Sequence, residues 1–133
     1  MNEQKVYLGG GLTNNWHEKV EKVDGYIYFN PRTKELPDSN RGSMTFAMYS
    51  TWDLHYVRQS DIVFIYVEKD NPSCIGLSVE AGYAKGLGKT VILVLEPNHY
   101  RISDNSLAFI SCVADITFET LDEGVEFLKS LRI

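Results

Sequence analysis

The chain has 133 residues, a common size for one compact domain, and we expect residues 1–133 to form a single domain. Hydrophobic residues make up 44% and charged residues 23%, which excludes a disordered chain. The net charge of −5, without a dense Lys/Arg cluster, excludes a general binder of DNA or RNA polymers. No apolar run approaches the roughly 20 residues that span a bilayer, and no signal-peptide pattern is present, so we expect a cytoplasmic protein without membrane contact.

Cysteine and histidine spacings are not those of a metal site. Cys74 and Cys112 are far apart and lack CxxC spacing, which also argues against a disulfide framework. His17, His55 and His99 fall on three different predicted segments, without HxxxH or HxH pairing. We therefore predict reduced cysteines and no metal.

Short apolar strands alternate with helices along the chain. The predicted elements are strands at 4–9, 26–29, 62–67, 90–95 and 115–118, and helices at 15–24, 44–59, 75–87, 106–112 and 121–131. The stretch from 30 to 42 is dense in Pro, Gly, Asp and Asn, which predicts a loop. Alternation of this kind predicts an α/β fold.

Strands that are continuous apolar runs favour a parallel sheet covered on both faces. About five such strands predict a doubly wound, flavodoxin-like fold with helices on both faces. In these folds the ligand lies beyond the carboxyl ends of the strands, which selects the segments 9–13, 68–75 and 96–105.

The segment CIGLSVEAGYAKG at 74–86 carries Glu80 close to a predicted helix start that follows a strand. A helix N-terminus stabilises negative charge, so a carboxylate there stays ionised and a sugar or phosphate can bind beside it. We therefore consider Glu80 as a nucleophile. The alternative is an ordinary solvated helix glutamate, which spacing alone favours.

Three segments resemble known catalytic or phosphate-binding motifs but do not match them. GLSVE is not the GxSxG nucleophile elbow, because Glu80 occupies the position of the second glycine. KGLGKT lacks the first glycine of a phosphate-binding loop and leads from helix into strand, the reverse of the required order. GGGLTN lacks GxGxxG spacing, so the sequence gives little support to dinucleotide binding.

The helix before the central strand contains Trp52 and Asp53. Trp52 can stack on a ligand or fill the core. Asp61 opens the next strand at the end away from the site, so we interpret it as structural.

Four motifs in this order resemble the nucleoside 2-deoxyribosyltransferase family, over residues 4–95. They are Tyr-Leu-Gly-Gly-Gly at 7–11, Asn-Pro-Arg at 30–32, Trp-Asp-Leu at 52–54 and GxSxExGYA at 76–84. The resemblance implies cleavage of the N-glycosidic bond of a nucleoside or nucleotide and transfer of the sugar to another base, without metal or organic cofactor. The carboxylate of Glu80 would form a glycosyl ester, Asp53 would protonate and deprotonate the bases, and Tyr7 would orient Glu80.

The resemblance also implies substrate contacts and self-association. The substrate-binding candidates are Gly9, Gly10, Trp52, Cys74, Gly76, Ser78 and Asn105. Asn105 would match a family asparagine donated across a subunit interface. We expect a homo-oligomer, with Tyr49, Trp52 and Tyr56 as an exposed aromatic patch for the contact.

Position 74 leaves the reaction open. The family carries aspartate there in transferases and serine in nucleotide hydrolases, whereas this chain has Cys74. The alternatives are an N-glycosidase of nucleoside 5'-monophosphates and a non-catalytic nucleotide-sensing module. A flavin binder is favoured only by the predicted topology, which is weak evidence for function.

Overall fold

The computed structural model describes residues 3–11, 14–31, 45–72, 74–100 and 105–132. The loop predicted at 30–42 lies outside these residues, apart from Asn30 and Pro31. The five strands are β1 (Gln4–Gly10), β2 (Tyr26–Phe29), β3 (Ile62–Val67), β4 (Thr90–Leu95) and β5 (Ile116–Phe118). They form one parallel sheet in the order β2-β1-β3-β4-β5. The flavodoxin-like prediction is therefore confirmed.

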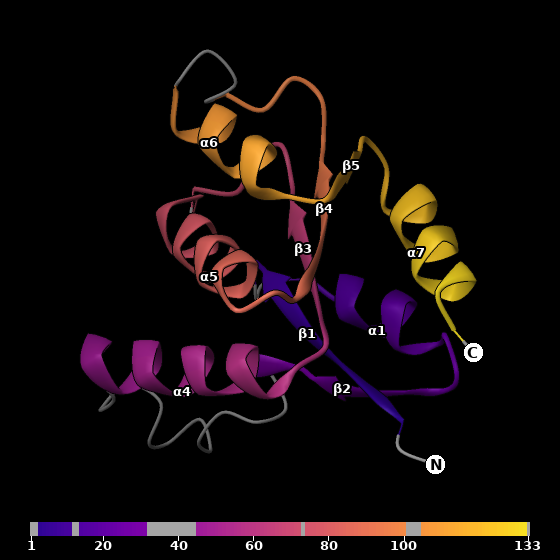
Figure 1. Ribbon diagram of the computed structural model, residues 1–133. Helices are drawn as coiled ribbons and strands as arrows, with labels where there is room; N and C mark the ends of the chain where they lie inside the picture. The colour runs from indigo at the N-terminus through magenta and orange to yellow at the C-terminus, as the bar shows by residue number, and fades with distance from the viewer. Residues whose placement is uncertain (1–2, 12–13, 32–44, 73, 101–104, 133) are drawn as a thin grey trace.

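Helices cover both faces of this sheet (Figure 1). The helices α4 (Phe46–Gln59), α5 (Cys74–Gly86) and α6 (Asn105–Val113) lie on one face, and α1 (Trp16–Glu21) and α7 (Leu121–Ser130) lie on the other. The predicted element ends differ from these by up to three residues. None of the described helices is both long and apolar enough to cross a membrane.

Side-chain alternation along β1 decides which residues reach the site. Val6 and Leu8 are buried beneath α1 and α7, whereas Tyr7 is buried on the opposite face, beneath α4 and α5. Because β1 lies inside the sheet, between β2 and β3, Tyr7 lies beneath two helices that follow different strands. The strand order reverses beside β1, where doubly wound folds bind their ligands.

Gly124 lets α7 approach the sheet closely. A Cβ atom at this position would lie 2.4 Å from Val94 Cγ2 and 3.0 Å from Phe64 Cζ. We expect Gly124→Ala to lower the free energy of unfolding by about 1–3 kcal/mol, as overpacking does, despite the better helix propensity of alanine. Urea denaturation measures this. The matched control is Gly82→Ala on α5, where nothing lies within 4 Å of the added methyl group, and an equal loss there would contradict the packing argument.

Candidate active site

A buried hydrogen bond joins two residues that are 73 positions apart in the sequence. The hydroxyl group of Tyr7 on β1 donates to Oε2 of Glu80 on α5, at 2.9 Å. The two side chains are only 2% and 8% exposed. The contact forms because α5 packs over the face of β1 from which Tyr7 points. Glu80 is therefore not the solvated helix glutamate that its spacing alone favours.

The sequence analysis placed Glu80 close to a helix N-terminus, which would keep its carboxylate ionised, and this placement is wrong. Helix α5 begins at Cys74, so Glu80 lies more than one turn inside it and not at its N-terminus. Burial, together with the charge of Asp53, raises the pKa of Glu80 from 4.5 to about 8, while the Tyr7 hydrogen bond acts in the opposite direction. Desolvation disfavours the charged carboxylate more than the hydroxyl group stabilises it. At neutral pH the carboxyl group of Glu80 is thus mostly protonated.

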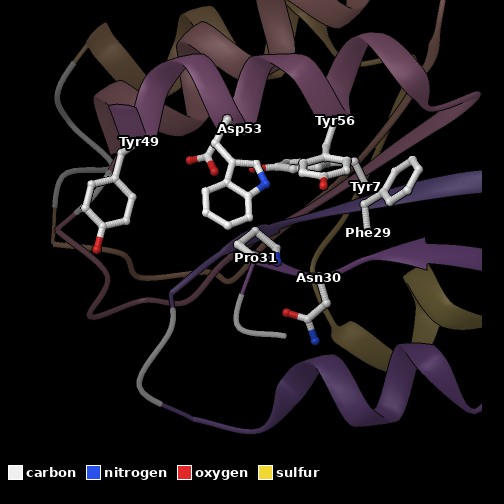
Figure 2. A pocket seen from close by; sticks show the side chains of 8 residues that line it. Tyr7, Phe29, Asn30, Pro31, Tyr49, Asp53 and Tyr56 are labelled. Atoms are coloured by element: carbon white, nitrogen blue, oxygen red, sulfur yellow. The ribbon is translucent and has the colours of Figure 1, made fainter. Parts of the chain in front are cut away.

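An aromatic pocket opens between α4, the carboxyl end of β2 and Tyr7 in the middle of β1 (Figure 2). Its lining residues are Tyr7, Phe29, Asn30, Pro31, Tyr49, Trp52, Asp53 and Tyr56. The rings of Phe29 and Tyr56 pack with centroids 4.8 Å apart, and Trp52 lies 6.3 Å from Tyr56. Asp53 is the one carboxylate among these lining residues. Tyr7 belongs both to this pocket and to the hydrogen bond with Glu80, so it links the pocket to the buried carboxyl group.

Five lining residues were not among the site residues inferred from the sequence: Tyr49 and Tyr56, which were expected in a subunit contact, and Phe29, Asn30 and Pro31. Phe29 ends β2, and Asn30 and Pro31 follow it at the carboxyl end of the strand. Asn30 is buried, and its Nδ2 donates to Glu21 Oε1 at 2.7 Å, which ties the pocket wall to α1. The position of Phe29, Asn30 and Pro31 at the end of a predicted strand could have marked them as site residues, because ligands of doubly wound folds bind at that edge of the sheet.

Two glycines after Tyr7 are explained by close packing. A Cβ at Gly9 would lie 3.2 Å from Glu80 Oε1, so Gly9 borders the buried carboxyl group. A Cβ at Gly10 would lie 2.6 Å from the ring of Trp16 and 2.7 Å from the carbonyl oxygen of Tyr66. The indole of Trp16 also donates to the carbonyl oxygen of Gly11 at 2.9 Å, and this bond holds the turn.

The remaining candidates lie away from the pocket lining. Cys74 is buried, with its Sγ 3.5 Å from the carbonyl oxygen of Asn71 and 3.8 Å from His99 Nε2. Ser78 Oγ donates to the Cys74 carbonyl oxygen within α5, and Gly76 is exposed. Asn105 begins α6, but its side chain lies outside the described residues. The described residues contain no group of three or more His, Cys, Asp or Glu side chains that could hold a metal ion.

The model of the family described as nucleoside 2-deoxyribosyltransferase-like matches residues 3–98. The chain belongs to this family. A comparison with curated protein sequences gave no match.

Solved structures agree with the family. A conserved protein from Enterococcus faecalis V583 has a TM-score of 0.74 at 14% identity, covering 98% of this chain and 99% of that one. A 2-deoxyribosyltransferase from Bacillus psychrosaccharolyticus has a TM-score of 0.66 at 25% identity, covering 90% and 88%. The Clostridium botulinum CMP N-glycosidase BcmB has a TM-score of 0.58 at 16% identity, covering 96% and 99%. Members of the family, including the deoxyribosyltransferase and the CMP N-glycosidase, act on N-glycosidic bonds. All three solved structures share the fold of this chain.

Proposed function

We propose that the protein cleaves the N-glycosidic bond of a nucleoside or deoxynucleoside and transfers the sugar to a second base through an ester on Glu80. The observation that carries this proposal is the buried Tyr7–Glu80 hydrogen bond beside an aromatic pocket that also contains Asp53. A carboxyl group beside a pocket lined by aromatic rings suits attack on a sugar carbon whose leaving group is a planar base.

The geometry supports a separate role for each of the three side chains. Tyr7 fixes one oxygen of Glu80, so the carboxyl group has a defined orientation for attack on the anomeric carbon. Asp53 lies in the same pocket as the aromatic rings, where it can donate a proton to the leaving base and accept one from the incoming base. Trp52, Tyr56 and their neighbours offer faces for stacking of the base.

The direct test is incubation with deoxynucleosides, nucleosides and nucleoside 5'-monophosphates, with and without an acceptor base, followed by chromatography of the bases. Exchange of base is the expected result. Release of base only from monophosphates, without exchange, would instead identify an N-glycosidase. Binding of these compounds without any turnover would identify the sensing module and overturn the proposed reaction.

Tyr7→Phe tests the orienting role. The form of Glu80 that attacks is the ionised carboxylate, and hydrogen bonds to charged groups contribute about 1.5–3 kcal/mol, so we expect kcat to fall by roughly 10- to 100-fold. The Tyr7 hydrogen bond lowers the pKa of Glu80, so its removal is expected to raise that pKa further. The measurements are kcat, KM and the pH dependence of the rate. An effect confined to KM would mean that the hydroxyl group binds substrate and does not orient Glu80.

For self-association we propose a surface different from the one expected from the sequence. Tyr49, Trp52 and Tyr56 are half-buried and line the pocket. The large apolar side chains exposed on the face formed by α4, α5 and α6 are Phe46, Met48, Ile75, Val79 and Phe109. Such an apolar surface is typical of a subunit contact, and the family resemblance supports a second copy as its partner.

Sedimentation analysis tests this contact. We expect a dimer or larger assembly for the unmodified chain and a monomer for Val79→Asp, because an unpaired charge would be buried in the contact. Leu87→Asp, at another exposed apolar position near the end of α5, separates general effects of a new charge from loss of the contact. A monomeric unmodified chain would contradict the proposal.

A further inference from the structure

A second carboxyl group lies along the same run of glycines as Glu80. A Cβ on Gly9 would stand 3.2 Å from Oε1 of Glu80, and a Cβ on Gly11 would stand 3.5 Å from Oε1 of Glu68. The carboxyl ends of β1 and β3 are paired, so Gly11 and Glu68 meet just beyond these ends. Because two residues of chain span at most about 7 Å, both carboxyl groups border one short stretch of backbone.

Hydrogen bonds from the turn after β1 hold Glu68 in place. Its Oε2 accepts from Asn14 Nδ2 at 2.5 Å. The orientation of the Asn14 amide is fixed because its Oδ1 accepts from the backbone nitrogen of Trp16 at 3.1 Å. In the part of the chain that the structure describes, Oε1 of the half-buried Glu68 accepts no hydrogen bond, and no Lys or Arg forms an ion pair with this carboxylate. The protein therefore fixes one oxygen, while the other lies over Gly11.

The order of these groups along β1 matches the order of the parts of a nucleoside. Tyr7 lines the aromatic pocket and donates to Glu80, which lies over Gly9. Glu68 follows over Gly11, one residue past the end of the strand. In a nucleoside the planar base is bonded to the anomeric carbon, and the 5'-hydroxymethyl group lies across the sugar ring from the base. With the base in the pocket and the anomeric carbon at Glu80, the 5'-end of the sugar points to Glu68.

We propose that Glu68 determines the substrate class: it accepts a hydrogen bond from the 5'-hydroxyl group of an unphosphorylated nucleoside and excludes nucleoside 5'-monophosphates. This inference rests on the proposed function for the positions of the base and the anomeric carbon. A carboxylate accepts a bond from a hydroxyl group, whereas it repels the charged oxygens of a phosphate. Proteins bind phosphate with backbone N–H groups and cationic side chains, but the side chain that lies over Gly11 is an anion.

Glu68→Gln separates this role from a purely structural one. The alternative is that Glu68 only ties the turn after β1 to the end of β3 through Asn14. The side-chain oxygen of glutamine can still accept from Asn14 Nδ2, so the substitution keeps the tie and removes the charge. A structural role predicts unchanged substrate selection, whereas the proposal predicts that selection against phosphate weakens.

The experiment compares kcat and KM for deoxynucleosides and their 5'-monophosphates. We expect the unmodified chain to prefer the nucleosides by about 100-fold or more in kcat/KM, and Glu68→Gln to lower this preference by about tenfold or more. The change is expected in KM with kcat nearly kept, because Glu68 contacts a part of the substrate remote from the bond that breaks. Asp70→Asn, at an exposed aspartate of the same loop, is the control for the loss of one charge and is expected to keep the preference.

A 5'-deoxy analogue of the nucleoside tests the hydrogen bond itself. This analogue lacks the hydroxyl group that Glu68 would bind, so its KM is expected to be higher than that of the parent nucleoside with the unmodified chain. With Glu68→Gln the difference between the two compounds is expected to shrink, since the charged acceptor is gone. An equal difference in both proteins would overturn the contact between Glu68 and the 5'-hydroxyl group.

Calorimetry with Glu80→Gln measures the same selection without turnover. Nucleosides are expected to bind about 100-fold or more tightly than their 5'-monophosphates. Monophosphates that bind as tightly as nucleosides, or an unchanged preference after Glu68→Gln is added, would overturn the proposal, as would an absence of binding by both classes. Failure of the proposed function is a different result: no base is released from any substrate, although the binding preference and its dependence on Glu68 persist.

Discussion

Glu80→Gln is expected to lower turnover by about a thousandfold or more, because an amide cannot form the ester intermediate while its shape and its bond from Tyr7 are preserved. The measurement is single-turnover release of base, together with mass spectrometry of the protein to detect a covalently attached sugar. The sugar adduct is expected on the unmodified chain and absent from the variant. Glu126→Gln, at an exposed glutamate of α7, is the matched control. Unchanged turnover in Glu80→Gln would rule out the nucleophile.

The same substitution is expected to stabilise the protein at alkaline pH. The pKa of Glu80 is raised from 4.5 to about 8 in the folded state, so the folded state binds more protons than the unfolded state between these values. The stabilising contribution of the protonated group is complete below about pH 4.5 and is lost as the pH rises through 8. Since one pKa unit corresponds to about 1.4 kcal/mol, the loss reaches at most about 5 kcal/mol.

Glutamine does not ionise, so Glu80→Gln escapes this loss. We expect its free energy of unfolding to match that of the unmodified chain near pH 4.5 and to exceed it increasingly toward pH 9. Urea denaturation at several pH values measures the difference. Equal stability of the two proteins across this range would show that burial does not penalise the charge of Glu80. Less activity with more stability is the combination typical of a strained functional residue.

Asp53→Asn is expected to reduce the rate with ordinary bases by about 10²- to 10⁴-fold, the range of general acid catalysis. With a substrate whose base leaves without protonation, the expected loss is small. This contrast arises because the amide cannot donate a proton to the base, whereas Glu80 remains able to attack. The ratio of kcat/KM values for the two substrate types is the quantity to measure.

Asp122→Asn, at an exposed aspartate of α7, is the control for the loss of one negative charge. It is expected to leave both rates unchanged. If Asp53→Asn lowered the rate equally with both substrate types, Asp53 would act in binding or packing and not in proton transfer.

The fold follows closely from the apolar pattern of the sequence. The runs 62–67 and 90–95 are buried, apart from the half-buried Thr90 and Leu95, as expected for strands of a parallel sheet covered on both faces. Helix ends were less exact, by up to three residues, because terminal turns depend on local caps. The Thr45 side chain, for example, accepts a bond from the Met48 amide at the start of α4.

Only some of the residues that line the pocket could be predicted from the sequence. Trp52 and Asp53 were found through the family resemblance, and both line the pocket. Phe29 and Asn30 come from a different strand end, and no periodicity connects them with α4. Cys74 packs against Asn71 and His99, outside the pocket lining, and its predicted contact with substrate stays a prediction.

For Glu80 the sequence by itself determined the residue, the helix that carries it and its family motif. Only the tertiary structure decided its protonation and its partner. The distance to Tyr7 and the exclusion of water arise when α5 packs on the sheet and α4 brings Asp53 near, and sequence spacing contains neither quantity. Propensity and periodicity are local properties, whereas the pKa of a carboxyl group depends on everything that surrounds it in space.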